Sequence, residues 1–305
     1  MIKKIFCISL RLIVGLIFIF SAIVKLFPAE ILEIAIVETG LMSWALAPFV
    51  ARLLIAFELF LGIVLITGLY PRLIIKVSLA TLLIFTVYLL IILLTQGNQD
   101  NCNCFGMLFF MTPFESVLKN IILIILLLIS LRLSSINKWR FSLITLISIG
   151  IISIVASFVS APIILRSDFP VPGQINYALN FDLIYNNPDT EEPEVNLKEG
   201  KWILVFLSTS CKQCVVAGYR LSVINNSIKN LPLYFFINGD DEGIKEFHFQ
   251  TKTRDIPYSN IKAQPMVYYT GGRLPTFFWI EDGVLVNQTG TYNFTGNDII
   301  NWLKN

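Results

Sequence analysis

The chain has 305 residues, of which 55% are hydrophobic and 14% are charged, and its mean hydropathy is +0.71. Soluble domains carry about 25% charged residues, so a single water-soluble globule is not expected. The formal net charge is only +2 and no long basic run is present, so we expect no nucleic-acid partner. The apolar residues crowd into positions 1–165, and the remainder has the composition of an ordinary soluble domain, which predicts two domains.

Five apolar stretches approach the roughly 20 residues that a helix needs to cross the hydrocarbon core of a membrane. They lie at 9–27, 47–69, 73–95, 115–134 and 141–160. Lys3 and Lys4 precede the first stretch as in a signal peptide, but its apolar run exceeds the roughly 7–15 residues of a cleavable segment and no clear cleavage site follows. We therefore predict an α-helical transmembrane bundle of about five helices over residues 1–160, with an uncleaved first helix.

The loop charges predict the orientation of this bundle, because Lys and Arg near helix ends stay on the cytoplasmic side. The connections 28–46 and 96–112 contain neither Lys nor Arg. If the helices alternate, the opposite side carries Lys3, Lys4, Arg72, Lys76, Arg132, Lys138 and Arg140. We predict a multi-pass protein of the bacterial inner (cell) membrane with a cytoplasmic N-terminus. Everything after Ala161 is then periplasmic or extracellular.

Four of the five cysteines fall on the non-cytoplasmic side, where disulfides form and persist: Cys102, Cys104, Cys211 and Cys214. A Cys-x-Cys sequence closes only a small ring, and strained disulfides have more oxidising potentials. Cys102 and Cys104 are therefore candidates to accept electrons, or to hold a mixed disulfide with Cys211. A fixed loop staple and a four-thiolate zinc site are alternatives.

Residues 161–197 contain five prolines and no long apolar period, which is typical of a linker. From residue 198 onwards the pattern predicts the order β-α-β-α-β-β-α. The expected strands are 202–207, 231–237, 276–280 and 284–288, with helices starting at Cys211-Lys-Gln-Cys214 and covering 241–251 and 297–304.

A strand, a Cys-x-x-Cys at a helix start, and Leu274-Pro275-Thr276 before a strand hairpin resemble the thioredoxin fold over residues 198–305. The resemblance implies an α/β thioredoxin-like domain in which Pro275 is cis and, with Leu274, binds substrate beside the cysteines. Ser210 stands where many thioredoxins have Trp, and Val205 where many reductive thioredoxins have a buried Asp. These two departures disfavour a reducing thioredoxin with the same proton relay.

The chemistry of this motif follows from its place on a helix. The N–H groups and the dipole at a helix N-terminus stabilise a thiolate, which predicts that Cys211 is the nucleophile. Cys214 lies nearly one turn later and can attack the resulting mixed disulfide, so it is the expected resolving cysteine.

The first half carries a second resemblance, over about residues 8–133. The sequences Arg11-Leu-Ile-Val-Gly15, Phe20-Ser-Ala22, Glu58 with Gly62 and Gly68, and Cys102-Asn-Cys-Phe-Gly106 resemble the MauE/DoxX group of small membrane proteins. The resemblance implies a redox-associated membrane domain.

Glu58 lies near the middle of the second expected membrane helix, where an ionised side chain is costly. It should face the bundle and be protonated or paired with Arg11, Lys25 or Arg52. A membrane relay or quinone-linked role and a helix-packing hydrogen bond are equally compatible with this position.

Together these features predict a membrane-tethered thiol–disulfide oxidoreductase. Electrons would pass between a secreted or periplasmic cysteine-containing client, the Cys211–Cys214 motif and the Cys102–Cys104 loop, with a quinone or redox partner as the candidate acceptor and no covalently bound cofactor. No pair of intramembrane cysteines is visible to carry electrons inward, which favours oxidation or isomerisation over reduction. The alternatives are a client-binding assembly factor with an inert thioredoxin-like domain and a cysteine-based metal chaperone.

Overall fold

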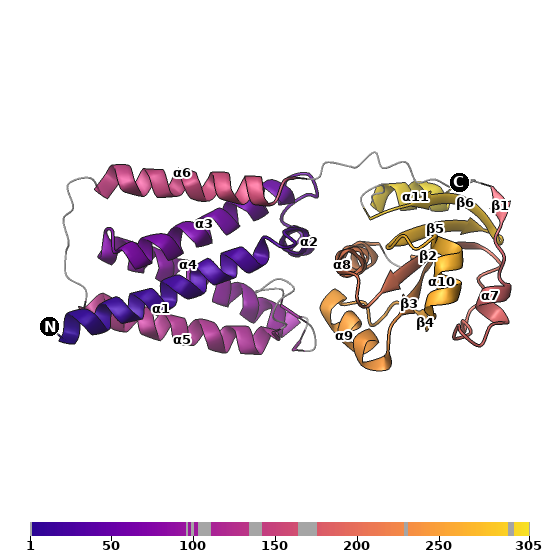
Figure 1. Ribbon diagram of the computed structural model, residues 1–305, viewed down its shortest axis with the longest axis horizontal. Helices are drawn as coiled ribbons and strands as arrows, with labels where there is room; N and C mark the ends of the chain where they lie inside the picture. The colour runs from indigo at the N-terminus through magenta and orange to yellow at the C-terminus, as the bar shows by residue number, and fades with distance from the viewer. Residues whose placement is uncertain are drawn as a thin grey trace. The chain divides into compact units, whose positions relative to one another are not determined.

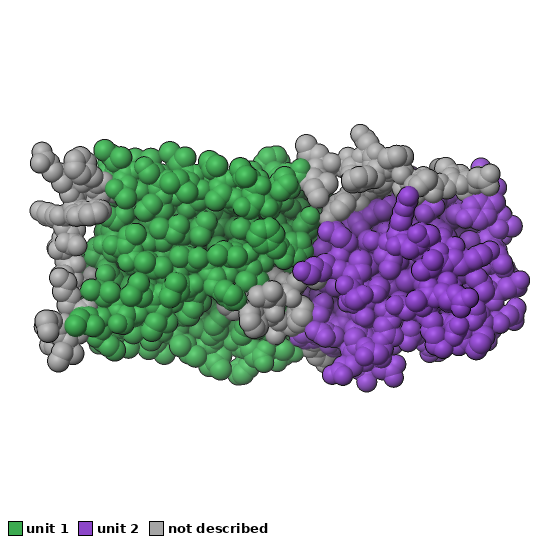
Figure 2. Space-filling view, in the orientation of Figure 1, with its two compact units in different colours: residues 1–163 green, residues 164–305 purple. Residues whose placement is uncertain are grey.

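The computed structural model describes residues 2–95, 97–98, 101–102, 111–133, 142–163, 176–228, 231–291 and 296–304. The chain divides into two compact units, residues 1–163 and 164–305, which Figure 2 shows in different colours.

The first unit is helical. Its described helices are α1 (Ile2–Lys25), α2 (Glu30–Glu38), α3 (Ala47–Thr67), α4 (Pro71–Thr95), α5 (Pro113–Leu133) and α6 (Ser142–Ser160). All of these except α2 are long and apolar enough to cross a membrane, which confirms the predicted bundle of five candidate spans and a multi-pass membrane protein. The short helix α2 lies in the connection 28–46, where the sequence predicted no helix.

These helices are apolar both inside the bundle and on its surface. Val14, Leu61 and Leu127 are fully buried, whereas Leu94 and Val159 on the outer surface are 84% and 74% exposed. Exposure of so many apolar side chains to water would be unfavourable. This distribution is therefore typical of helices that are surrounded by lipid.

Several segments that are distant in the sequence meet at one end of the bundle. The Arg52 side chain at the start of α3 pairs with Glu33 of α2 and donates to the carbonyl oxygen of Ala161, 3.0 Å away, just beyond α6. The helices alternate in direction, so the end of α4 and the start of α5 lie at this end too (Figure 1). The connection that contains Cys102 and the point where the chain leaves α6 therefore share one end of the bundle.

The second unit is built on a six-stranded sheet with the order β1-β6-β5-β2-β3-β4. The strands are β1 (Tyr177–Ala178), β2 (Lys201–Ser208), β3 (Leu233–Asn238), β4 (Tyr258–Asn260), β5 (Thr276–Glu281) and β6 (Val284–Thr289). Strands β2, β3 and β4 run parallel, while β5 pairs antiparallel with both β2 and β6, and β1 pairs antiparallel with β6.

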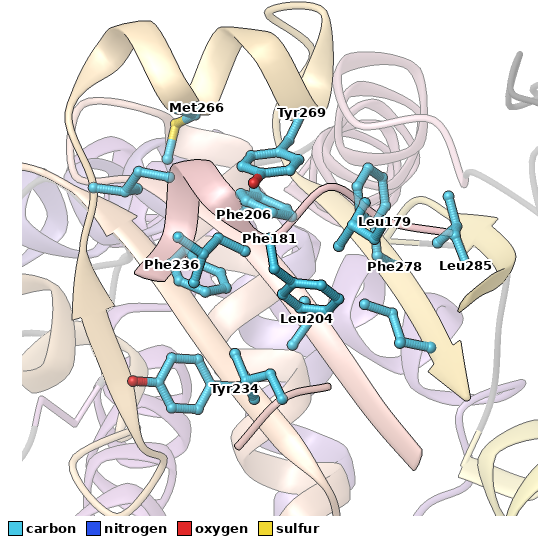
Figure 3. Packing of buried hydrophobic residues seen from close by; sticks show 14 residues of the cluster. Leu179, Phe181, Leu204, Phe206, Tyr234, Phe236, Met266, Tyr269, Phe278 and Leu285 are labelled. Atoms are coloured by element: carbon cyan, nitrogen blue, oxygen red, sulfur yellow. The ribbon is translucent and has the colours of Figure 1, made fainter. Parts of the chain in front are cut away.

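Helices cover both faces of this sheet, which explains why β2 is continuously apolar. They are α7 (Asp182–Tyr185), α8 (Lys212–Ser227), α9 (Asp241–Thr251), α10 (Ala263–Thr270) and α11 (Gly296–Lys304). Leu204 and Phe206 of β2 pack in one buried cluster with Phe181 beside α7 and Met266 and Tyr269 of α10 (Figure 3). The alternate β2 side chains point to the opposite face, and α8 lies on that side of the sheet (Figure 1).

The described part of the predicted linker differs from the expectation. Within residues 176–197, β1 joins the sheet edge through the pair Tyr177 and Leu285. Phe181, Ile184 and Leu197 are buried in the same cluster as the strands. These apolar residues are irregularly spaced among prolines and so produce no periodic signal, yet they cover the sheet and belong to the second unit.

Candidate functional site

Cys211 lies between β2 and α8 and is the N-cap of that helix. Its backbone is extended, with φ −96° and ψ 109°, so its sulfur turns back over the first turn of α8. The N–H of Cys214 donates to the Cys211 Sγ over 3.2 Å. The helix therefore holds the sulfur of its own capping residue with a backbone donor, as side-chain oxygens are held at other N-caps.

The electrostatics of the two cysteines are opposite. The pKa of Cys211 is lowered from 9.0 to about 7, chiefly by the hydrogen bond with the Cys214 thiol and also by the N–H groups of Cys214 and Gln213, against the opposing effect of burial. Burial is the main cause that raises the pKa of Cys214, and the neighbouring Cys211 raises it further. At neutral pH the pair thus presents one partly ionised sulfur with a protonated thiol behind it.

Access reinforces this asymmetry. Cys211 is partly exposed, whereas Cys214 is 0% exposed. A partner sulfur can therefore approach Cys211 first, and Cys214 can react only with a group already joined to Cys211.

The turn before β5 completes the site. The Leu274–Pro275 peptide bond is cis, as the thioredoxin resemblance implied, and the Cys211 sulfur lies 4.0 Å from the Leu274 carbonyl oxygen. Thr276 pairs with Phe206 of β2, which places the turn next to the loop that leads into α8. The fold thus brings together Cys211, Cys214, Leu274 and Pro275.

The loop between β2 and Cys211 contains contacts that the sequence did not predict. The hydroxyl oxygens of Ser208 and Ser210 lie 3.0 Å apart. A Cβ atom on Gly239 would lie 2.4 Å from the Thr209 Cγ2, so a larger residue there would displace the Thr209 side chain in this loop. Nothing in the local sequence indicates this contact, because Gly239 follows the neighbouring strand β3.

Cys102 precedes α5 in the chain and is buried against the first turn of that helix. Its sulfur lies 2.9 Å from the hydroxyl oxygen of Ser116, and its N–H donates to the Met111 carbonyl oxygen over 2.9 Å. Cys104 lies outside the described residues, so a bond between Cys102 and Cys104 stays a prediction.

Glu58 is 3% exposed and faces the inside of the bundle. Of its three expected partners, Lys25 forms the ion pair, and the Ser21 hydroxyl donates to the second carboxylate oxygen over 3.1 Å. The Lys25 ammonium also lies 5.7 Å from the centre of the Phe85 ring. Arg52 is instead buried with Glu33.

Within the described residues, no group of three or more His, Cys, Asp or Glu side chains is placed to hold a metal ion.

The second unit is a thioredoxin-like domain. Its central strands β6-β5-β2-β3 carry the Cys-x-x-Cys at the start of the helix between the parallel strands and a cis-proline before the antiparallel hairpin. The predicted fold class is thus confirmed, since this domain follows a bundle with five candidate membrane helices.

Comparison with known proteins finds similarities for both units. Residues 3–133 match the family model described as methylamine utilisation protein MauE, so the helical first unit is similar to that family. Protein TlpB of Flavobacterium psychrophilum is 27% identical over 84% of this chain and 83% of its own length. A secreted Mycobacterium tuberculosis disulfide oxidoreductase, described as homologous to DsbE of E. coli, aligns with 34% of this chain and 81% of its own at 14% identity, with a TM-score of 0.26.

Proposed function

We propose that this protein is a membrane-tethered thiol–disulfide oxidoreductase that oxidises secreted or periplasmic cysteine-containing clients. The observation that carries the proposal is the asymmetry of the two cysteines on α8. The Cys211 sulfur is accessible, is held by the Cys214 N–H and has a pKa of about 7, whereas Cys214 is fully buried.

Client oxidation starts from the Cys211–Cys214 disulfide. A client thiolate attacks the Cys211 sulfur, the disulfide bond breaks, and Cys214 leaves as a thiolate that takes up a proton. A second client thiolate attacks the client sulfur of the mixed disulfide, forms the client disulfide and releases the Cys211 thiolate. The lowered pKa of Cys211 makes its sulfur a better leaving group than an ordinary thiol in this second step. The oxidising direction is proposed because the sequence offers no pair of intramembrane cysteines that could carry electrons inward.

The reduced domain then passes its two electrons to a Cys102–Cys104 disulfide. The Cys211 thiolate attacks this disulfide and forms a mixed disulfide, which Cys214 resolves, so the loop cysteines end as two thiols. The shared chain raises the effective concentration of one pair near the other to about millimolar without a permanent interface. A quinone or a redox partner is the proposed acceptor of these electrons, and reduction of a quinone also consumes two protons.

Glu58 is the proposed relay for those protons, because Glu58 and its partners Lys25 and Ser21 form a buried polar cluster in the bundle. The proposed setting is the bacterial inner membrane, with a cytoplasmic N-terminus and with both cysteine pairs in the periplasm or outside the cell. The support for this orientation is the absence of Lys and Arg from the connections 28–46 and 96–112.

The redox state of Cys211 and Cys214 in growing cells tests this electron path. Thiols are blocked by acid quenching and alkylation, and the reduced fraction is measured by mass spectrometry in the variant C102S/C104S and in the control C7S. Cys7 lies beside Ser130 and belongs to neither pair. We expect the reduced form to accumulate in C102S/C104S alone. An unchanged ratio, or accumulation of the oxidised form, contradicts the proposed oxidising path.

A second experiment, which measures client disulfides in the variant C211S, separates this function from a client-binding assembly factor. A factor that only holds its client does not need the Cys211 sulfur, so C211S would leave client disulfides intact. We expect C211S instead to abolish client oxidation at a normal protein level.

A further inference from the structure

The contact between Cys102 and Ser116 is buried at the start of α5. Cys102 is 8% exposed and Ser116 is 0% exposed, and 2.9 Å separates the sulfur from the hydroxyl oxygen. The N–H of Cys102 donates a hydrogen bond to the carbonyl oxygen of Met111, which precedes α5 by two residues. The backbone thus fixes the sulfur over the first turns of that helix.

The backbone donors of this first turn are already used. Thr112 and Glu115 form a capping box, in which the Thr112 N–H donates to the Glu115 carboxylate and the Glu115 N–H donates to the Thr112 hydroxyl. The Phe114 N–H donates to the Asn98 side chain over 3.0 Å, and the Ser116 N–H donates to the Thr112 carbonyl oxygen. The group of this turn that reaches the Cys102 sulfur is therefore the Ser116 hydroxyl.

We propose that Ser116 is a positioning residue that makes Cys102 the leaving group of the membrane-loop disulfide. This inference rests on the proposed electron path. Because Cys102 is buried, an incoming Cys211 thiolate attacks the other sulfur of that disulfide. The S–S bond breaks, its electron pair moves to the Cys102 sulfur, and the Ser116 hydroxyl donates a hydrogen bond to the new thiolate. A hydroxyl can donate to or accept from a neutral thiol, but it can only donate to a thiolate, so the contact favours the charged form.

The α5 helix offers a matched control for this role. Ser130 is also 0% exposed, and its hydroxyl oxygen lies 3.5 Å from the sulfur of Cys7. The change S130A also removes a fully buried serine hydroxyl from α5, but one that lies beside a cysteine outside the proposed path. The change S116T keeps the hydroxyl at the site itself.

Alkylation of Cys102 tests the proposal on the purified, fully reduced, full-length protein in detergent. Iodoacetamide is added across a pH series, and the rate at Cys102 is read by peptide mass spectrometry. Hydrogen bonds to charged groups are strong, so we expect S116A to slow alkylation at pH 7 about tenfold and to move its pH profile upward by about one unit. S130A should leave the profile unchanged, and S116T should retain it.

An unchanged or faster rate in S116A overturns the proposal, and so does an equal effect of S130A, which would indicate only a general loosening of α5.

A second readout uses the variant C214A, which cannot resolve the mixed disulfide. The partner of Cys211 within the chain should be Cys104, and a bond to Cys102 overturns the assigned leaving group. Alkylation needs neither client nor electron acceptor, so it can support the role of Ser116 even if C102S/C104S leaves the redox state of Cys211 unchanged and the electron path fails.

Discussion

Gly15 and Gly62 are in direct backbone contact where α1 crosses α3. A Cβ atom on Gly15 would lie 2.8 Å from the carbonyl oxygen of Gly62, and a Cβ atom on Gly62 would lie 2.8 Å from that of Gly15. Small residues at helix crossings let backbones approach closely in membranes, where packing drives association. Glu58 lies one turn before Gly62, so this crossing also determines how α3 presents Glu58 to Ser21 and Lys25 of α1.

The change G62A should therefore destabilise the bundle. Its methyl group would meet backbone atoms of Gly15 and Ile19, which cannot move without separating the helices. Overpacking of this kind costs about 1–3 kcal/mol, so we expect a lower melting temperature in detergent. G150A is the control, because its nearest neighbour is a Phe60 ring atom 3.8 Å away. If G62A melts no lower than G150A, the close crossing is contradicted.

Breaking the Lys25–Glu58 pair should cost more than removing both of its charges. Loss of one partner from a buried pair leaves an uncompensated charge and costs about 3–5 kcal/mol, while an apolar replacement of both is often tolerated. We expect K25M to unfold at a lower denaturant concentration than K25M/E58M. Equal or greater loss in the double variant would show that the ion pair is not the main role of these residues. If the double variant folds, slow reoxidation of its loop cysteines would support the relay role of Glu58.

The rate at which Cys211 is alkylated should reach half of its maximum near neutral pH. Its pKa is about 7 rather than 9.0, so half of the reduced protein carries the reactive thiolate near pH 7, and the rate should level off above about pH 8. The Cys214 thiol is the main cause of this lowering, so C214A should move the midpoint to higher pH. A wild-type midpoint near pH 9 would exclude the activated nucleophile.

Long elements and local motifs were predictable from the sequence, whereas contacts between distant segments were not. The apolar run of β2 and the start of α8 at the cysteines lie within one or two residues of the prediction. The short helices α7 and α10 were missed, because a few irregularly placed apolar residues carry no period. The partner of Glu58 was not predictable, because Lys25 reaches it from another helix, across the contact between α1 and α3.

In the candidate site, too, local motifs were predictable and contacts between distant segments were not. The place of Cys211 at the start of α8 and the cis form of Pro275 were predictable from motifs a few residues long. Ser116 gave no such signal, because its contact with Cys102 requires a connection to fold back onto a helix that begins later in the chain.

The two cysteine pairs should lie on the same side of the membrane. The outer membrane of whole cells is permeabilised, and a maleimide that cannot cross the inner membrane is added. It should label reduced single-cysteine variants that retain Cys104 or Cys211. The variant that retains Cys7 should be labelled only after the membrane is dissolved. Labelling of Cys104 and Cys211 from opposite sides would make direct electron exchange between the pairs impossible.

Trapping of the mixed disulfide in C214A tests the central claim most directly. The variant is isolated from cells after acid quenching, and mass spectrometry identifies what is bound to Cys211. The proposed path predicts a bond to the loop cysteine Cys104 or to a cysteine of a secreted client, with C7S/C214A giving the same products. Recovery of Cys211 only as an unmodified thiol from an oxidising compartment would contradict it.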